Sequence, residues 1–106
     1  MANFKNWNKS SFVANQFSPI VSGDPSASVQ LVGMIISNNS PSSDAYVEID
    51  LYSGSVYSGK ILPSGNPIEA GQSIYLDSKV FLMEYDYVRA TSSISTVSVI
   101  ANGVVL

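Results

Sequence analysis

The sequence predicts an all-β protein: a single antiparallel β-sandwich of about eight strands, of jelly-roll or Greek-key type, with an extended N-terminal arm. From residue 17 onward, short β-rich segments alternate with turn residues at intervals of roughly 8 to 12 residues. No segment has the apolar spacing of an amphipathic helix. The chain has 106 residues, which is the size of one ordinary domain. We therefore expect an arm over residues 1–16 and a sandwich over residues 17–106.

The predicted arm is rich in Asn, Lys and Ser and shows neither helical nor strand periodicity. Its aromatic side chains, Phe4, Trp7 and Phe12, are unfavourable to leave in water. Two interpretations follow. The arm either anchors on a neighbouring subunit, as the enrichment of tryptophan at interface hot spots favours, or is a frayed terminus.

The clearest predicted strand spans residues 44–53, where apolar and polar side chains alternate strictly. This alternation predicts one core face and one solvated face. The predicted core face carries Ala45, Val47, Ile49 and Leu51, and the polar face carries Tyr46, Glu48, Asp50 and Tyr52. The other predicted strands span residues 17–21, 29–37, 55–62, 73–76, 79–83, 87–91 and 96–106. Turn residues such as Asn, Ser, Gly and Pro separate these segments.

The segment 29–37 carries apolar residues on both of the faces that strand alternation gives it. Alternation places Val29, Leu31 and Ile35 on one face and Val32, Met34 and Ile36 on the other. Both faces should therefore be covered, as in strands buried on both sides. We expect an arm, a loop or a neighbouring subunit to cover the second face, which makes Val32, Met34 and Ile36 predicted oligomer contacts.

The composition argues against an enzyme and against several classes of partner. The chain has no histidine and no cysteine, so the commonest general base, thiolate nucleophiles and zinc–thiolate sites are excluded. Its net charge is −3 and its five basic residues are scattered, which argues against nucleic acid. The longest apolar run, residues 31–36, is too short for a membrane span. We expect no catalytic residue, no metal and no cofactor.

Carboxylates are the remaining candidates for chemistry. The pairs Glu48/Asp50 and Glu84/Asp86 each share a face, as an acid and a base would have to. The same spacing arises on any solvent-facing strand, and we favour that interpretation. A calcium site at Glu84 and Asp86 with Asp77 is a weaker alternative, because no calcium-loop spacing is present.

Two tyrosines, Tyr46 and Tyr52, lie on the polar face of the strand at 44–53. Tyrosine supplies contact area together with a hydroxyl group, so it suits protein interfaces and stacking on sugar rings. Cross-strand pairing within the sheet explains a single tyrosine equally simply. We predict Tyr46 and Tyr52 as partner contacts, with a carbohydrate- or receptor-binding module as the alternative class of function.

Three segments carry a resemblance to a known group of proteins. They are Gly33–Asn39, Pro67–Ser73, and Asp86–Ser93 leading to Val97–Ile100. In this order they resemble small structural proteins of tailed bacteriophage particles.

The resemblance implies a compact sandwich that decorates the capsid or sits at the neck, tail or baseplate, commonly as a trimer. It implies a non-enzymatic virion protein, first of all a capsid cement protein bound to the major capsid protein and assembled in the host cytoplasm. A neck, baseplate or fibre-attachment protein is the alternative that it leaves open.

Overall fold

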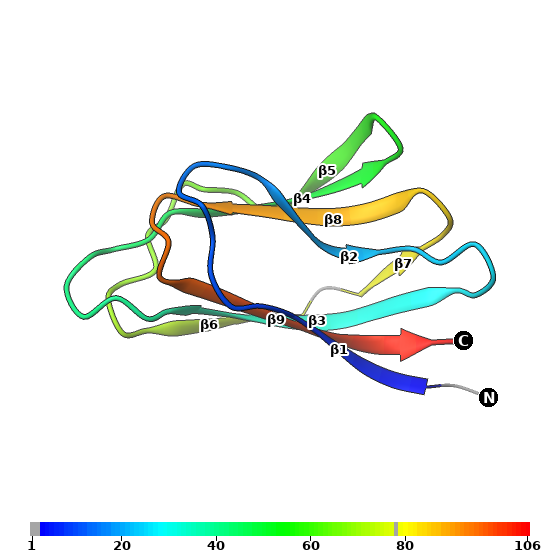
Figure 1. Cartoon of the computed structure of the whole chain (residues 1–106), viewed down its shortest axis with the longest axis horizontal. Coiled ribbons are helices and arrows are strands. Elements are labelled where there is room, and N and C mark those ends of the chain that lie inside the picture. The colour runs from blue at the N-terminus through cyan, green and yellow to red at the C-terminus, as the bar shows by residue number, and fades with distance from the viewer. Residues whose placement is uncertain (1–2, 78) are drawn as a thin grey trace.

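The structure, a computed structural model, describes residues 3–77 and 79–106. These residues form nine strands in two antiparallel sheets packed face to face (Figure 1). The predicted fold class, an antiparallel β-sandwich, is confirmed. The strands are β1 (Asn3–Lys9), β2 (Ser18–Ser22), β3 (Val29–Asn38), β4 (Val47–Ser53), β5 (Val56–Leu62), β6 (Ser73–Leu76), β7 (Val80–Leu82), β8 (Asp86–Ser92) and β9 (Val97–Val105).

The strands pair as a nested series. Sheet A has the order β1-β9-β3-β6, with β7 also pairing β3, and sheet B has the order β2-β8-β4-β5. The first strand pairs with the last, β2 with β8, β3 with β6 and β7, and β4 with β5. Successive strand pairs in this series alternate between the two sheets, so the chain winds around one core.

The core lies between the sheets and is built by alternation along each strand. In β9, Val97, Val99 and Ala101 are buried, whereas Ile100 between them is 43% exposed on the outer side. In β4, Val47 and Ile49 are buried as the alternation predicts, whereas Asp50, predicted on the solvated face, is only 2% exposed beside Arg89. The sequence therefore sets which side of each strand faces inward wherever the strand is regular.

The strand β3 is not regular, and this corrects the prediction of a strand apolar on both faces. Its pairing with β9 shifts between Leu31 and Gly33, so Val32 is the extra residue of a β-bulge. The bulge changes the parity of the strand, and Met34 and Ile36 enter the same core as Leu31, with 0% exposure.

The N-terminal region also differs from the predicted arm. Residues 3–9 form β1, an edge strand that pairs with β9 from Asn3 opposite Val105 to Lys9 opposite Val99. Phe12 is buried in the core, and its backbone N–H donates to the carbonyl oxygen of Ser95 at 3.1 Å. An edge strand is half-exposed and tolerates Lys and Asn, which explains why its sequence lacks a strand period.

Candidate interaction surface

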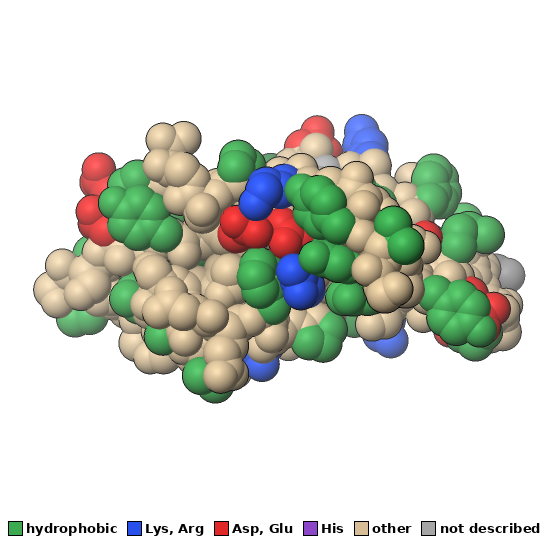
Figure 2. Space-filling view, turned by 90° about the horizontal axis from the view of Figure 1, so that it is seen from above, with side chains coloured by type: hydrophobic (Ala, Val, Ile, Leu, Met, Phe, Trp, Pro, Cys, Tyr) green, Lys and Arg blue, Asp and Glu red, His purple; other side chains and the backbone are tan. Residues whose placement is uncertain are grey.

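The two outer faces of the sandwich differ in charge. On the outer face of sheet B, acidic and basic side chains gather at the middle (Figure 2). Arg89 lies between the rings of Phe17 and Tyr52, 3.8 and 4.2 Å from their centroids. Its Nη2 donates to the Tyr52 hydroxyl at 2.9 Å and lies 3.6 Å from Oδ2 of Asp50. Aromatic packing and ion pairing thus hold this cluster together.

Two carboxyl groups in the cluster have opposite electrostatic environments. The hydrogen bond from Lys60, whose Nζ lies 2.8 Å from Oε1 of Glu48, lowers the pKa of Glu48. Burial raises the pKa of Asp50, and the neighbouring Glu48 raises it further. Both carboxyl groups have charged neighbours within the sheet, as expected for a structural cluster.

The outer face of sheet A is built by the strands β1, β9, β3, β6 and β7. Cross-strand registers align their outward side chains in rows. One row runs from Phe4 through Val104 and Gln30 to Phe81. Another contains Ile100, Ile35 and Tyr75. These rows come from segments far apart in the sequence.

We call this surface the apolar face. Its apolar members are Phe4, Val32, Ile35, Tyr75, Phe81, Ile100 and Val104. The polar positions between them carry neutral Asn, Gln and Ser side chains. Among the described residues of these five strands, no outward-pointing side chain is charged. Phe4 is 89% exposed, Phe81 60% and Tyr75 58%. With about 200 Å² per aromatic side chain, these three rings alone expose about 400 Å².

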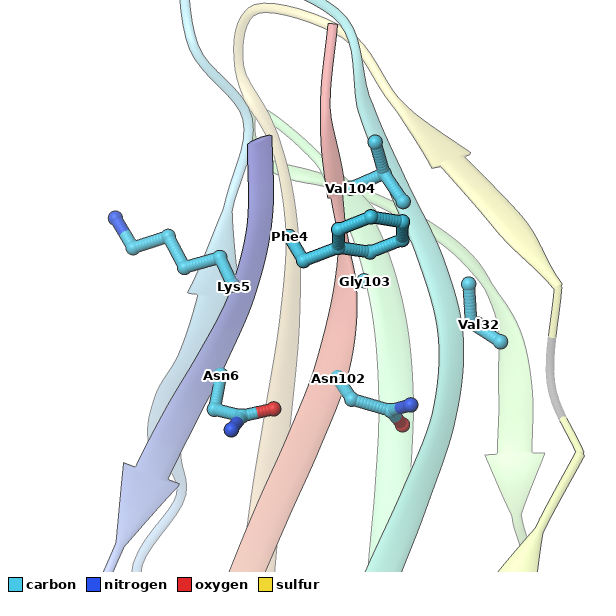
Figure 3. Close-up of a pocket in the computed structure, with 7 residues that line it drawn as sticks. All are labelled: Phe4, Lys5, Asn6, Val32, Asn102, Gly103 and Val104. Carbon is cyan, nitrogen blue, oxygen red and sulfur yellow. The ribbon is translucent and has the colours of Figure 1, made fainter. Parts of the chain in front are cut away.

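A groove of about 300 Å³ crosses the apolar face beside Phe4 (Figure 3). Its floor is β9 at Asn102 and Gly103, and Val32 of the bulge borders it on the β3 side. A Cβ atom at Gly103 would overlap the carbonyl oxygen of Gln30, so the close approach of β9 to the bulged strand requires glycine. The groove therefore depends on the bulge that the sequence did not reveal.

The predicted contact residues fall into three groups. Phe4 and Val32 come together at the groove, although they are 28 positions apart in the chain. Phe12, Met34 and Ile36 lie in the core, so they offer no surface to a partner, which corrects that prediction. The remaining three lie elsewhere: half-buried Trp7 packs against the core, Tyr52 lies in β4 of the other sheet, and exposed Tyr46 directly precedes that strand.

Sequence reasoning missed five members of the apolar face, namely Ile35, Tyr75, Phe81, Ile100 and Val104. Ile35 was assigned to the opposite face because alternation was continued through the bulge. For Ile100 and Val104 a signal was available, because residues 90–106 contain no charged residue at all. A final strand that should have one solvated face but carries no charge indicates a surface destined for burial.

The weaker candidates for chemistry can also be located. Oδ2 of Asp86 accepts the backbone N–H of Met83 at 2.9 Å and so closes the turn before β8. Within residues 3–77 and 79–106, no three His, Cys, Asp or Glu side chains converge as metal ligands would. The same residues include no helix of the length and apolarity that crossing a membrane takes.

Comparison with known proteins gives a likeness in fold. No protein-family model matches the sequence, and no curated protein matches it. A chain in the T13 particle of infectious bursal disease virus superimposes with a TM-score of 0.53 and 9% identity, over 98% of this chain and 30% of that one. The chain thus spans less than a third of that protein.

Two further solved structures align over almost the whole chain. One is infectious bursal disease virus strain Gx, with a TM-score of 0.47 and 11% identity, covering 95% of this chain and 31% of that one. The other is a pentameric capsid protein from metagenomic phage sequences, with a TM-score of 0.46 and 19% identity, covering 97% and 60%. The T13 particle chain establishes the shared feature: this chain has a β-sandwich fold found in a viral particle.

Proposed function

We propose that the protein is a non-enzymatic structural subunit of a virus particle, and that its apolar face is buried against another subunit. The observation that carries this proposal is the apolar face itself, whose five strands have no outward-pointing charged side chain among their described residues. Contiguous apolar patches of this size on soluble monomers are often functional, and larger ones mark interaction sites. The viral-particle fold supports a structural role.

The strand order supports the jelly-roll version of the sandwich. Two four-stranded layers, with β6 and β7 counted as one interrupted strand, and the nested pairing of first with last strand fit an eight-stranded jelly roll. Jelly rolls of this kind build viral capsid proteins among others. One architecture can serve many functions, so the surface, and not the strand order, indicates the function.

Within this class we propose a capsid cement protein that binds other virion subunits such as the major capsid protein. The resemblance to small tailed-phage proteins supports that choice and implies a location in the virion after assembly in the host cytoplasm. A neck, baseplate or fibre-attachment protein is the alternative. The resemblance also implies a homo-oligomer, namely a trimer, and the apolar face supports self-association.

Co-sedimentation with virus heads tests the proposal. Expanded and mature heads assembled without the chain are mixed with the purified protein, and we expect it to sediment with at least one of them. Ile100→Glu places a charge at the middle of the apolar face and should abolish binding. Val56→Glu, at an exposed position of β5 on the other sheet, is the matched control and should bind normally.

The outcomes separate the alternatives. Failure to bind either head, together with tight binding to tail or neck components, contradicts the cement version. Failure to bind any virion component contradicts the structural-subunit proposal.

The carbohydrate-binding alternative loses part of its support in the structure. The Tyr52 ring stacks on Tyr87 at 5.6 Å and meets Tyr57 edge-on at 5.5 Å, and its hydroxyl accepts the Arg89 hydrogen bond. These contacts favour a role within the sheet for Tyr52. Glycan binding that is lost in a folded Tyr46→Ala variant would reinstate this class of function.

A further inference from the structure

We infer that the partner of the apolar face is a second copy of this chain, packed face to face about a two-fold axis with Phe4 as the anchor. This inference rests on the proposed function: the apolar face joins two copies, and the remaining surface of the pair binds the virus head, so Ile100→Glu removes head binding by breaking a pair whose two copies attach together. Three observations carry it: the charge of the face, its shape and its size.

The charge distribution suits self-association. The chain has thirteen charged residues, five basic and eight acidic, and a net charge of −3. Two copies therefore repel each other at long range. In a two-fold interface the same patch faces itself, so a charged side chain near the axis would meet its own like-charged mate. The outward positions of the five strands avoid this repulsion, and Lys5, which also lines the groove, holds its Nζ 5.6 Å from the Trp7 ring centroid, on the other side of β1 from Phe4. A partner of opposite charge would be recognised better by a charged face.

The shape of the face is self-complementary. Phe4 is 89% exposed and stands beside the groove of about 300 Å³, so a projecting ring and a hollow lie next to each other (Figure 3). A two-fold axis between two such faces places the ring of each copy in the groove of the other, against Val32 and Val104. The amides of Asn6 and Asn102, which also border the groove, are both donors and acceptors and can pair across the axis.

The exposed apolar area of the face is enough for the centre of a stable interface. Its three exposed rings supply about 400 Å² of apolar area, and Ile35 and Ile100 are each more than 40% exposed beside them. A standard interface buries about 800 Å² on each partner, with an apolar centre and a polar rim. The apolar centre with its Asn, Gln and Ser border fits this arrangement. Face-to-face packing of two sheets, about 10 Å apart, is a common way to bury such a surface.

Measurement of the solution mass tests the inference. The full chain should sediment at twice its monomer mass of 11.3 kDa at micromolar concentrations. Phe4→Ala should raise the dissociation constant of the dimer about 30-fold, as expected for a central aromatic hot spot. Ile100→Glu should give monomers, and Val56→Glu should remain dimeric. Circular dichroism of each variant shows that the fold is intact.

Several results would overturn the inference. They are a monomer at every concentration, a trimer, or a dimer that folded Phe4→Ala and Ile100→Glu variants leave unchanged. A monomer that still sediments with virus heads would overturn the second copy while leaving the proposed function in place. A dimer that binds no virion component would contradict the proposed function and leave the pairing of two copies in place.

Discussion

Asn38 lies buried at the end of β3 and holds three backbone groups. Its side-chain amide donates to the carbonyl oxygens of Ser43 and Ile68, each at 2.8 Å, and its Oδ1 accepts the N–H of Ser40 at 3.0 Å. Asn39 beside it is exposed and donates to Oγ of Ser98 at 3.1 Å. In the sequence the two residues are equivalent turn signals, and only the fold distinguishes them.

Asn38→Ala should lower the free energy of unfolding by about 2–4 kcal/mol, because it removes the three hydrogen bonds of a buried side chain and leaves a space in its place. Asn39→Ala should change it by about 0.5 kcal/mol or less, because water replaces its partner. Urea denaturation of both variants measures the difference. Equal losses in the two variants would show that the Asn38 hydrogen bonds contribute nothing specific.

The charged cluster on sheet B makes stability depend on pH through Glu48. Its pKa is lowered in the folded state, so it contributes stability that is present above its ordinary value of 4.5 and is lost as pH falls through the folded pKa. Asp50, whose pKa burial raises, acts in the opposite sense and gains stability as pH falls through its raised pKa. The two effects partly offset each other.

Glu48→Gln should therefore reduce stability at neutral pH, and the difference from the unmodified chain should vanish as pH falls below 4.5 and through the folded pKa of Glu48. The loss should be small, because Lys60 is 45% exposed and solvent screens the pair. Urea unfolding at a series of pH values measures it. Glu69→Gln, which removes an exposed carboxylate elsewhere, controls for net charge, and a difference that persists at low pH would contradict the assignment.

At the scale of elements, β1 separates two aromatic residues that the sequence presents together. Phe4 and Trp7 are three residues apart, so strand alternation places them on opposite sides. Trp7 packs against the core, whereas Phe4 is 89% exposed on the apolar face. One strand thus contributes both to the stability of the subunit and to its outer surface.

Trp7→Ala should lower the free energy of unfolding by about 2–3 kcal/mol, somewhat less than for a fully buried aromatic. Phe4→Ala, its matched control on the same strand, should lower it by about 0.5 kcal/mol or less in the monomer. Chemical denaturation below the concentration of any self-association measures both. A large loss in the Phe4 variant under these conditions would contradict the alternation of β1.

The strands predicted best from the sequence are those with one side facing the core, because their apolar and polar residues alternate. The alternation of Val47 and Ile49 in β4, and the turn residues around it, suffice to place that strand. The bulge at Val32 could not be predicted, because it is defined by pairing with β9 on a distant part of the chain. The edge strand β1 could not be predicted either, because half of its backbone and most of its side chains face water.

For the candidate surface, individual residues could be predicted from the sequence, but not which of them lie side by side in the fold. Phe4 and Val32 were predicted as contacts, but their meeting at one groove depends on the order β1-β9-β3 in sheet A. Met34 and Ile36 were misplaced by the single residue of the bulge. Register is a property of two strands, so one strand's pattern cannot supply it.

For the whole molecule, the nested pairing makes most contacts long-range. Among the strands of the described residues, β4 and β5 are the only consecutive ones that pair, and β1 pairs with β9, the last strand in the sequence. Pairing of distant strands loses loop-closure entropy before the stabilising contacts form, so such topologies fold slowly.

Refolding should accordingly take milliseconds to seconds. Trp7 is the single tryptophan and packs at the β1–β9 pair, so its fluorescence reports the meeting of the two ends. Stopped-flow dilution from urea measures the rate. Refolding in microseconds would contradict the dependence on long-range pairing.

The pairing of β1 with β9 also bears on how the chain can be engineered. Asn3 is the register partner of Val105, and both ends lie at the same end of sheet A (Figure 1). A short linker could join them, with new ends opened in the exposed turn at Gly65, where an added Cβ would meet no atom within 4 Å. Tags or displayed peptides fused at either terminus would emerge from one end of the sandwich, beside the groove at Phe4 and Val104, so new ends at Gly65 would move them away from the apolar face.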